Sequence, residues 1–270
     1  IRDRICYSHF RSINFYFGGV LDMDRMDQFL LGKPKYDLNH PAIKTGFESI
    51  DSQTTFLRRG TLALLGSRPG MGKTTIALQI ASNITDAGGT VLVFSLRQSV
   101  SQVSDRVYAF KRDLTSCSNF YTEDRVGNID EMKLVMKDFR KPVDLILVDC
   151  IQDVYYISPK KHPVYSSPKV CTALKVMARH HNAAVLALTQ ISRAVEGRAD
   201  HHPLLTDIPG WESIKQSVDS ACLLSRGGYY EIEDEDTELP ATLSFCPSTD
   251  KCCSVFMKWN HQANCLKDST

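Results

Sequence analysis

A glycine-rich loop that is followed by a lysine and two threonines separates two differently patterned segments of the chain. Before it, residues 61–65 read as a buried strand, and after it residues 75–81 carry the apolar spacing of a helix. Backbone N–H groups in such a loop converge on an anion, and the dipole of the following helix adds to them. A lysine here would reach the terminal phosphates, and a threonine hydroxyl would bind Mg²⁺. We therefore predict a P-loop for a nucleoside triphosphate, made of Ser67, Arg68, Pro69, Gly70, Met71, Gly72, Lys73, Thr74 and Thr75.

Two polar residues end later apolar runs and would complete such a site. Asp149 follows the run 145–148, at the place where P-loop proteins hold Mg²⁺ together with the P-loop hydroxyl of Thr74. Gln190 closes the run 184–188, and we expect it to sense the terminal phosphate and to share the catalytic role with Lys73. The alternatives are an aspartate that starts a loop or caps a helix, and a plain surface glutamine.

Alternating strands and helices must position these residues. We predict strands at 61–65, 91–94, 145–148, 184–188 and 220–224, and helices from residue 74, within 100–111, around 130–139 and at 169–181. Continuous apolar strands between helices are typical of an α/β fold with a mostly parallel sheet covered on both faces. The final segment, roughly 228–265, has the pattern of a β-hairpin.

Composition limits the class of partner and the compartment. The net charge is +1, so local loops would have to supply contacts to nucleic-acid phosphates. No run approaches the roughly 18 apolar residues of a membrane span. The nine cysteines show no C-x-x-C spacing, so we expect reduced thiols in a reducing, cytoplasmic compartment. A zinc site is the less favoured reading of Cys246, Cys252, Cys253, His261 and Cys265.

The first 40 residues differ in character from the rest, and we divide the chain into a helical linker arm (1–40) and a main domain (41–270). The arm carries an apolar stripe at helical spacing, formed by Val20, Met23, Met26, Phe29 and Leu30. This stripe packs either on the chain's own core or on a neighbouring subunit. Because the chain begins at Ile1 without a methionine, we expect it to be part of a longer protein.

Several runs beside the P-loop form a specific pattern. They are Thr45-Gly46-Phe47-Glu48-Ser49-Ile50-Asp51, Phe94-Ser95-Leu96, Ile146-Leu147-Val148-Asp149 with Ile151-Gln152, Thr189-Gln190-Ile191-Ser192-Arg193-Ala194-Val195-Glu196, and Ser213-Ile214-Lys215-Gln216 with Asp219. In these runs the chain resembles the ATPase domain of hexameric replicative DNA helicases of the DnaB type, from about residue 43 to residue 230 and weakly to the end. The P-loop of that family also lacks the usual first glycine, where this chain has Ser67.

The resemblance implies a RecA-like P-loop NTPase fold, with ATP and Mg²⁺ as cofactors. It also implies ATP-driven 5′-to-3′ translocation on single-stranded DNA by a ring of six subunits, in which neighbours share the nucleotide sites. The expected partners are ATP, single-stranded DNA, and either further copies of this chain or an active helicase.

Three departures from the family set this chain apart. Arg97 stands where the family has a glutamate that activates the attacking water, a group that contributes about 10²–10⁴-fold. The run 243–251 stands where the family supplies a lysine and an arginine finger, yet no arginine follows Arg226. The run 207–212, which corresponds to the loop that grips the DNA backbone, has Pro209 in place of a basic residue.

These departures leave two functions open. The first is a working ATP-dependent DNA helicase, in which Asp153 replaces the base and Lys251 the finger. The second is a catalytically degenerate, helicase-like protein that binds ATP and regulates or scaffolds replication. In the second reading, Arg97 would hold the terminal phosphate and hydrolysis would be very slow. A recombination ATPase and a metabolite kinase fit the motifs less well.

Overall fold

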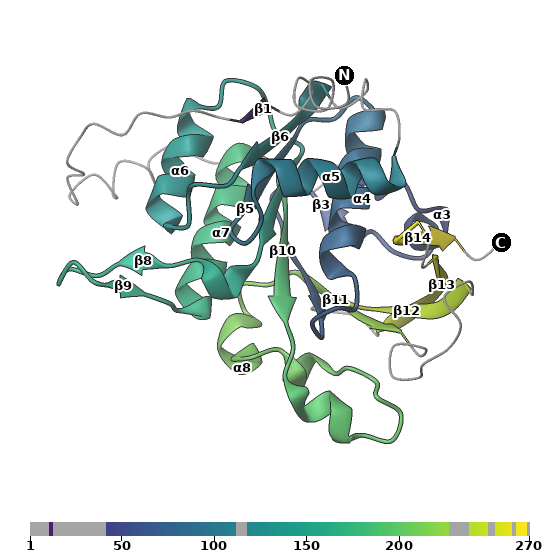
Figure 1. Ribbon diagram of the computed structural model, residues 1–270. Coiled ribbons are helices and arrows are strands. Elements are labelled where there is room, and N and C mark those ends of the chain that lie inside the picture. Colours follow the sequence, from purple (N-terminus) through teal and green to yellow (C-terminus); the bar gives the residue numbers. More distant parts are fainter. Residues whose placement is uncertain are drawn as a thin grey trace.

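The computed structural model describes residues 11–12, 42–111, 118–226, 238–247, 252–260 and 263–268. Within these ranges the chain forms a central sheet between two layers of helices (Figure 1). The apolar stripe predicted for residues 20–30 lies outside the described residues, as do His261 and residues 248–251. No helix in the described ranges is long and apolar enough to cross a membrane.

One large sheet organises the described part of the chain, with the strand order β1-β6-β5-β7-β10-β4-β11-β12-β13-β14. Seven neighbouring strands pair in parallel: β1 (Arg11–Ser12), β6 (Phe120–Glu123), β5 (Val91–Ser95), β7 (Leu145–Asp149), β10 (Ala184–Gln190), β4 (Leu62–Ser67) and β11 (Ser220–Arg226). Three antiparallel strands extend the sheet: β12 (Glu238–Pro247), β13 (Cys253–Asn260) and β14 (Cys265–Asp268). The predicted mostly parallel α/β sheet and the predicted hairpin near its end are both confirmed.

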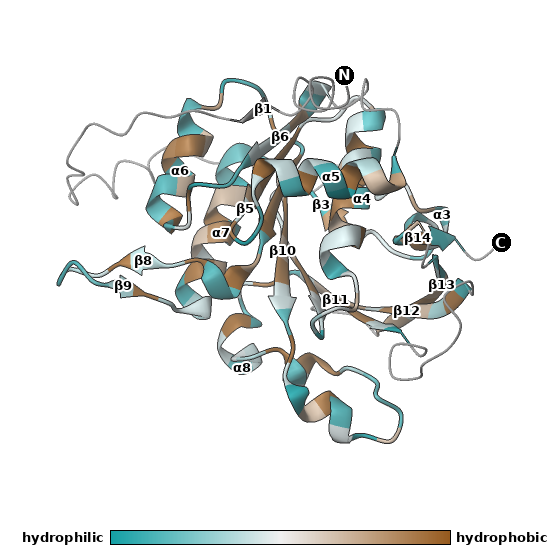
Figure 2. Ribbon diagram, in the orientation of Figure 1, coloured by the Kyte–Doolittle hydropathy of each residue, from teal (hydrophilic) through white to brown (hydrophobic). Residues whose placement is uncertain are grey.

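Helices cover both faces of this sheet. The core on one face contains side chains of α4 (Lys73–Asp86) and α5 (Val100–Phe110), and the core on the other contains those of α6 (Ile129–Asp138) and α7 (Ser167–His181). Successive residues of β4 alternate between the two cores, Leu62 and Leu64 on one face and Ala63 and Leu65 on the other. Figure 2 shows the resulting hydrophobic strands at the centre of the fold. Because both faces are buried, the strand sequences are continuously apolar rather than alternating.

The predicted elements are present, with their ends shifted by a few residues, and several short ones were not predicted. The main omission is β6, whose four residues include a threonine and a glutamate and therefore lack a continuous apolar run. Other unpredicted short elements include the pair β2 (Ala42–Ile43) and β3 (Leu57–Arg58), the helix α3 (Glu48–Asp51) between them, the hairpin β8 (Tyr156–Ile157) and β9 (Pro163–Val164), and the helix α8 (Trp211–Ile214). Such short segments depend on contacts made elsewhere in the fold.

The cysteines differ from expectation at one place. Cys246 and Cys252 form a disulfide, so the prediction that these two thiols are reduced is wrong for this structure. The register of β12 and β13 pairs Phe245 with Cys253, which places the two cysteines opposite each other at the end of the hairpin. In the described ranges, no group of three or more His, Cys, Asp or Glu side chains could hold a metal ion.

A carboxylate organises the segment that precedes the first core strand. Asp51 accepts hydrogen bonds from the backbone N–H and the hydroxyl of Thr45, at 2.8 and 2.9 Å, and from the N–H of Gly46 at 3.0 Å. The side-chain amide of Asn83 in α4 donates to the carbonyl of Thr45 at 3.0 Å. Gly46 has φ +80°, and a Cβ there would lie 2.5 Å from that of Asn83. The segment is thereby fastened to the helix that follows the P-loop.

Replacing Asp51 with alanine should destabilise the fold. The substitution leaves the N–H groups of Thr45 and Gly46 without their acceptor, at a cost of about 1–3 kcal/mol. Urea unfolding followed by circular dichroism measures this cost. Glu48→Ala, at an exposed position of the same short helix, is the control and should change stability by no more than about 0.5 kcal/mol. Equal stability of the two variants would contradict the role given to Asp51.

Candidate nucleotide-binding site

Three parallel strands bring the predicted site residues to one edge of the sheet. The register of β10 and β4 pairs Gln190 with Ser67, so the glutamine lies beside the start of the P-loop. β7 pairs with the other side of β10 and ends at Asp149. The Thr74 hydroxyl donates to Asp149 Oδ2 at 2.8 Å, which joins the P-loop helix to the end of β7. The structure therefore brings together residues that the sequence placed far apart.

The P-loop turns sharply before its helix begins. Gly70 and Gly72 have φ values of +79° and +99°, a left-handed conformation that side chains other than glycine rarely adopt. α4 begins at Lys73 and continues for 14 residues, so the N-terminus of a long helix opens at the loop. Its first N–H groups and the helix dipole favour an anion at this point. This local backbone fits the phosphate-binding loop that the sequence predicts.

The residues beside this loop fit a nucleotide-bound magnesium ion. The Thr74 hydroxyl and the Asp149 carboxylate, already in contact, are hard oxygen ligands of the kind that Mg²⁺ prefers. Asp149 is largely buried, with 7% of its surface exposed, so a cation there would compensate the burial of its charge. Mg²⁺ usually takes one or two protein ligands and completes its shell with phosphate oxygens and water. Thr74 and Asp149 supply that pair.

One predicted P-loop residue has another use for its side chain. The Arg68 guanidinium donates to Glu196 Oε1 at 2.8 Å and to the carbonyl of Ile191 at 2.9 Å. It is 8% exposed, so this ion pair is fixed against the segment that follows β10. Any contribution of Arg68 to phosphate binding therefore comes from its backbone, while its side chain ties the P-loop to the neighbouring loop.

A glutamine connects the ends of β7 and β10. The Gln152 amide, in the 3₁₀ helix η3 (Ile151–Asp153), donates to the Thr189 hydroxyl at 2.7 Å and to the Gln190 carbonyl at 3.1 Å. Sequence reasoning placed Gln152 within a motif without giving it a role. Its hydrogen bonds connect the end of β10, at Gln190, to the segment that directly follows Asp149. A displacement of one strand end would therefore be transmitted to the other.

Two residues under the P-loop were missed by sequence reasoning. Trp259 of β13 lies against Gly72 so closely that a Cβ on this glycine would be 2.3 Å from the indole. Arg226, at the end of β11, stacks 4.3 Å from the centre of the Trp259 ring and donates to the Met71 carbonyl at 3.3 Å. The end of β11 and the antiparallel strand β13 thus both contact the P-loop. No local signal could have revealed this, because the contacts join distant parts of the sequence.

Arg97 follows β5 and forms an ion pair with Asp153. Its Nε and Nη2 lie 2.5 and 3.2 Å from the two carboxylate oxygens, and the Cys150 thiol donates to the same carboxylate at 3.0 Å. Burial raises the pKa of Cys150 to about 12, so the thiol keeps its proton for this hydrogen bond. Burial also pushes the pKa of Asp153 upward, but the hydrogen bonds from Arg97 and Cys150 outweigh it and hold that pKa below its usual value. Asp153 is therefore an ionised, weakly basic carboxylate.

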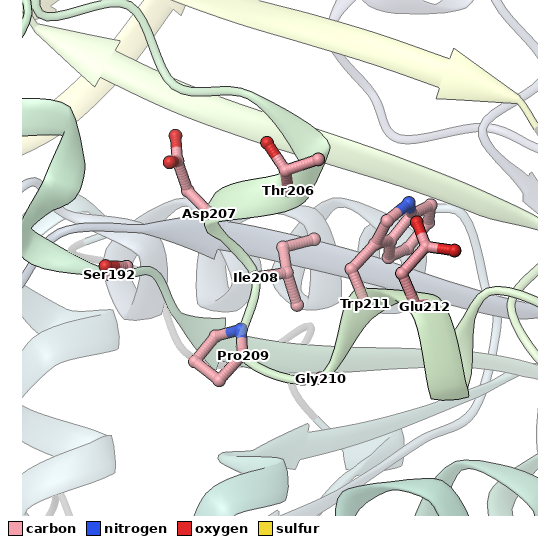
Figure 3. A pocket seen from close by; sticks show the side chains of 8 residues that line it. All are labelled: Ser192, Thr206, Asp207, Ile208, Pro209, Gly210, Trp211 and Glu212. Carbon is pink, nitrogen blue, oxygen red and sulfur yellow. The ribbon is translucent and has the colours of Figure 1, made fainter.

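The loop predicted to correspond to a DNA-gripping loop surrounds a largely apolar hollow of about 540 Å³. Figure 3 shows its lining, which is Ser192, Thr206, Asp207, Ile208, Pro209, Gly210, Trp211 and Glu212. Asp207 is bound by Arg198 through a two-pronged ion pair, and Pro209 presents no charge. The lining itself contains no basic residue. Of the run 243–251, where an arginine finger was sought, residues 248–251 lie outside the described ranges.

Comparison with known proteins gives a consistent result. The family model described as "DnaB-like helicase C terminal domain" matches residues 42–119 and 111–251. A replicative DNA helicase DnaB of Helicobacter pylori is 25% identical over 245 residues, covering 79% of this chain and 50% of its own length. DnaB of Geobacillus stearothermophilus is 29% identical over 227 residues, covering 73% and 50%. The chain thus spans about half the length of the curated relatives it matches.

Solved structures show the same fold. One solved ATPase domain has a TM-score of 0.71 at 22% identity, covering 86% of this chain and 93% of its own. A DnaB-like replicative helicase, described together with its interactions with primase, has a TM-score of 0.71 at 21% identity, covering 87% and 65%. These matches confirm the expected RecA-like ATPase architecture.

Gly72→Ala should damage the nucleotide site. The new methyl group would collide with Trp259 on a backbone that disfavours side chains, at a cost on the order of 1–3 kcal/mol. If about 1.4 kcal/mol of that cost falls on the nucleotide-binding conformation of the loop, nucleotide affinity drops about tenfold. Gly88→Ala is the matched control, because its φ is +87° but nothing lies within 4 Å of the added atom. If both variants bind a fluorescent ATP analogue equally well, the contact with Trp259 does not shape the loop.

Proposed function

This chain belongs to the family of DnaB-like helicase C-terminal domains, and on that premise we propose that it binds ATP with Mg²⁺ as the motor domain of a replicative DNA helicase. The domain would act on single-stranded DNA within a ring of six such subunits, or within a mixed assembly with an active helicase. Because the chain spans about half of each relative, the activity of a whole helicase remains part of this proposal.

The observation that carries the proposal is the contact between Thr74 and Asp149 at the mouth of a glycine-rich loop. The 2.8 Å hydrogen bond holds a hydroxyl and a carboxylate together where α4 begins. Lys73, the first residue of that helix, would place its ammonium group on the terminal phosphates. Bound Mg²⁺ would neutralise charge on the phosphate oxygens. Gln190, held at the adjacent strand end by Gln152, supports a role in sensing the terminal phosphate.

Lys73→Ala should strongly weaken nucleotide binding. Loss of a charge-assisted contact to phosphate costs about 1.5–3 kcal/mol, equivalent to roughly 10–150-fold in affinity. Titration with a fluorescent ATP analogue in the presence of Mg²⁺ measures this change. The control is Lys137→Ala, which removes an exposed lysine from the last turn of α6. Unchanged affinity of the Lys73 variant would remove the basis of the proposal.

A second function is favoured by the ion pair between Arg97 and Asp153. Asp153 is the carboxylate that could replace the family's base, and the neighbouring charge of Arg97, in addition to its hydrogen bonds, lowers the pKa of Asp153 and so reduces its basicity. This supports a chain that binds ATP, turns it over slowly, and regulates or scaffolds replication. Removal of a general base typically costs about 10²–10⁴-fold in rate.

Steady-state hydrolysis with and without single-stranded DNA distinguishes the two functions. We expect wild-type turnover to be very slow, and Arg97→Glu, which restores a carboxylate after β5, to be faster. Both proteins are assayed at saturating ATP. A wild-type rate of about one per second or more, within the ordinary range of enzymes, would exclude the degenerate reading and support a working helicase.

A further inference from the structure

Arg97 and Asp153 occupy adjacent strand ends at the nucleotide edge of the sheet. β5 pairs with β7 so that Ser95 lies opposite Asp149, and the N–H of Leu96 donates to the Asp149 carbonyl at 3.0 Å. Arg97 therefore directly follows Leu96, whose backbone is hydrogen-bonded to Asp149, the proposed magnesium ligand. Asp153 closes the short helix that follows the same aspartate. The ion pair is built onto the site rather than onto a remote surface.

The charges of the pair extend to the P-loop side of the site. Asp149 interacts electrostatically with Arg97, and Lys73 interacts electrostatically with Asp153. Two cationic and two anionic groups are therefore near enough to influence one another at the edge where the terminal phosphates are expected. A terminal phosphate bound here would add negative charge beside these four side chains. It would attract the Arg97 guanidinium and repel the Asp153 carboxylate.

Among the guanidinium groups near the P-loop, Arg97 differs in how it is held. The Arg68 side chain is only 9% exposed and fixed by Glu196, and Arg226 is buried against Trp259 and the Met71 carbonyl. In contrast, the side chains of Arg97 and Asp153 are 44% and 34% exposed. A solvent-accessible ion pair contributes little net stability, so exchanging one partner costs little.

We infer that Arg97 is a ligand of the terminal phosphate, held ready by Asp153 and released from it when a nucleoside triphosphate binds. A guanidinium presents the same two-pronged geometry to a carboxylate and to a phosphate. The exchange makes the site prefer ATP over ADP, because ADP lacks the group that competes with Asp153. This inference rests on the proposed binding of ATP and adds that a side chain of the same subunit reads the terminal phosphate.

The test is the ratio of ATP to ADP affinity, measured with Mg²⁺ and fluorescent analogues of both nucleotides. Arg97→Ala should weaken ATP binding about tenfold or more and leave ADP binding unchanged, since a charge-assisted contact is lost with one ligand alone. Asp153→Ala removes the competitor and should tighten ATP binding severalfold, again with ADP unchanged. The double variant should bind ATP much more weakly than Asp153→Ala does, because the gain from removing Asp153 depends mainly on freeing Arg97.

Two further variants keep the result interpretable. Arg59→Ala breaks an ion pair with Asp144, which directly precedes β7 at its opposite end, and should leave both affinities as in the wild type. Arg97→Lys keeps the positive charge but loses the two-pronged hydrogen bonding of the guanidinium, and it should retain part of the preference for ATP. Circular dichroism measures whether each variant is folded. If Arg97→Ala does not fold, Arg97→Lys replaces it in the affinity measurements.

The outcomes separate this inference from the proposed function. If the wild type binds ATP and the Arg97 variants keep its ATP to ADP ratio, the inference is wrong while nucleotide binding stands. Loss of ATP binding in Asp153→Ala would also overturn it, because Asp153 would then contact the bound metal or its water directly. A wild-type chain that binds neither nucleotide would contradict the proposed function itself.

Discussion

The parallel pairing of β4, β10 and β7 is the constraint on which the rest of the structure depends. Parallel strands that are buried on both faces must satisfy their backbone groups in neighbouring strands, and this aligns their carboxyl ends at one edge. Ser67, Gln190 and Asp149 therefore meet although long stretches of chain separate them. The contact between Thr74 and Asp149 follows from this alignment, because the helix after β4 begins above the end of β7.

A second set of contacts fixes the shape of the P-loop. Arg68 connects it to Glu196 in the segment after β10, while Arg226 at the end of β11 and Trp259 of the antiparallel strand β13 support it from the other side of β4. Arg68, Arg226 and Trp259 are buried, and each guanidinium charge is compensated by a carboxylate, a carbonyl or an aromatic ring. The loop is thereby coupled to both of its neighbours in the sheet, and a change in its conformation would be felt on both sides.

The edge of the sheet also shows how one scaffold can carry altered chemistry. Arg97 stands after β5, where the family resemblance led us to expect a glutamate, and Asp153 supplies a carboxylate from the adjacent strand end. The backbone hydrogen bonds between Leu96 and Asp149 are unaffected by this difference, because they involve main-chain atoms alone. Fold and phosphate cradle can thus persist while the groups that face the terminal phosphate differ.

The sequence by itself determined the central strands, their helices and the P-loop, because continuous apolar runs, helical spacing and glycines before Lys73 are local signals. The short strand β6 and the pairing of Cys246 with Cys252 were not predictable, since one lacks an apolar run and the other follows from the register of β12 and β13. The support of Gly72 by Trp259 and the ion pair of Arg97 with Asp153 arise only when distant segments are packed together. Local patterns specify which elements form, whereas side-chain partners across strands are decided by how the sheet brings those elements together.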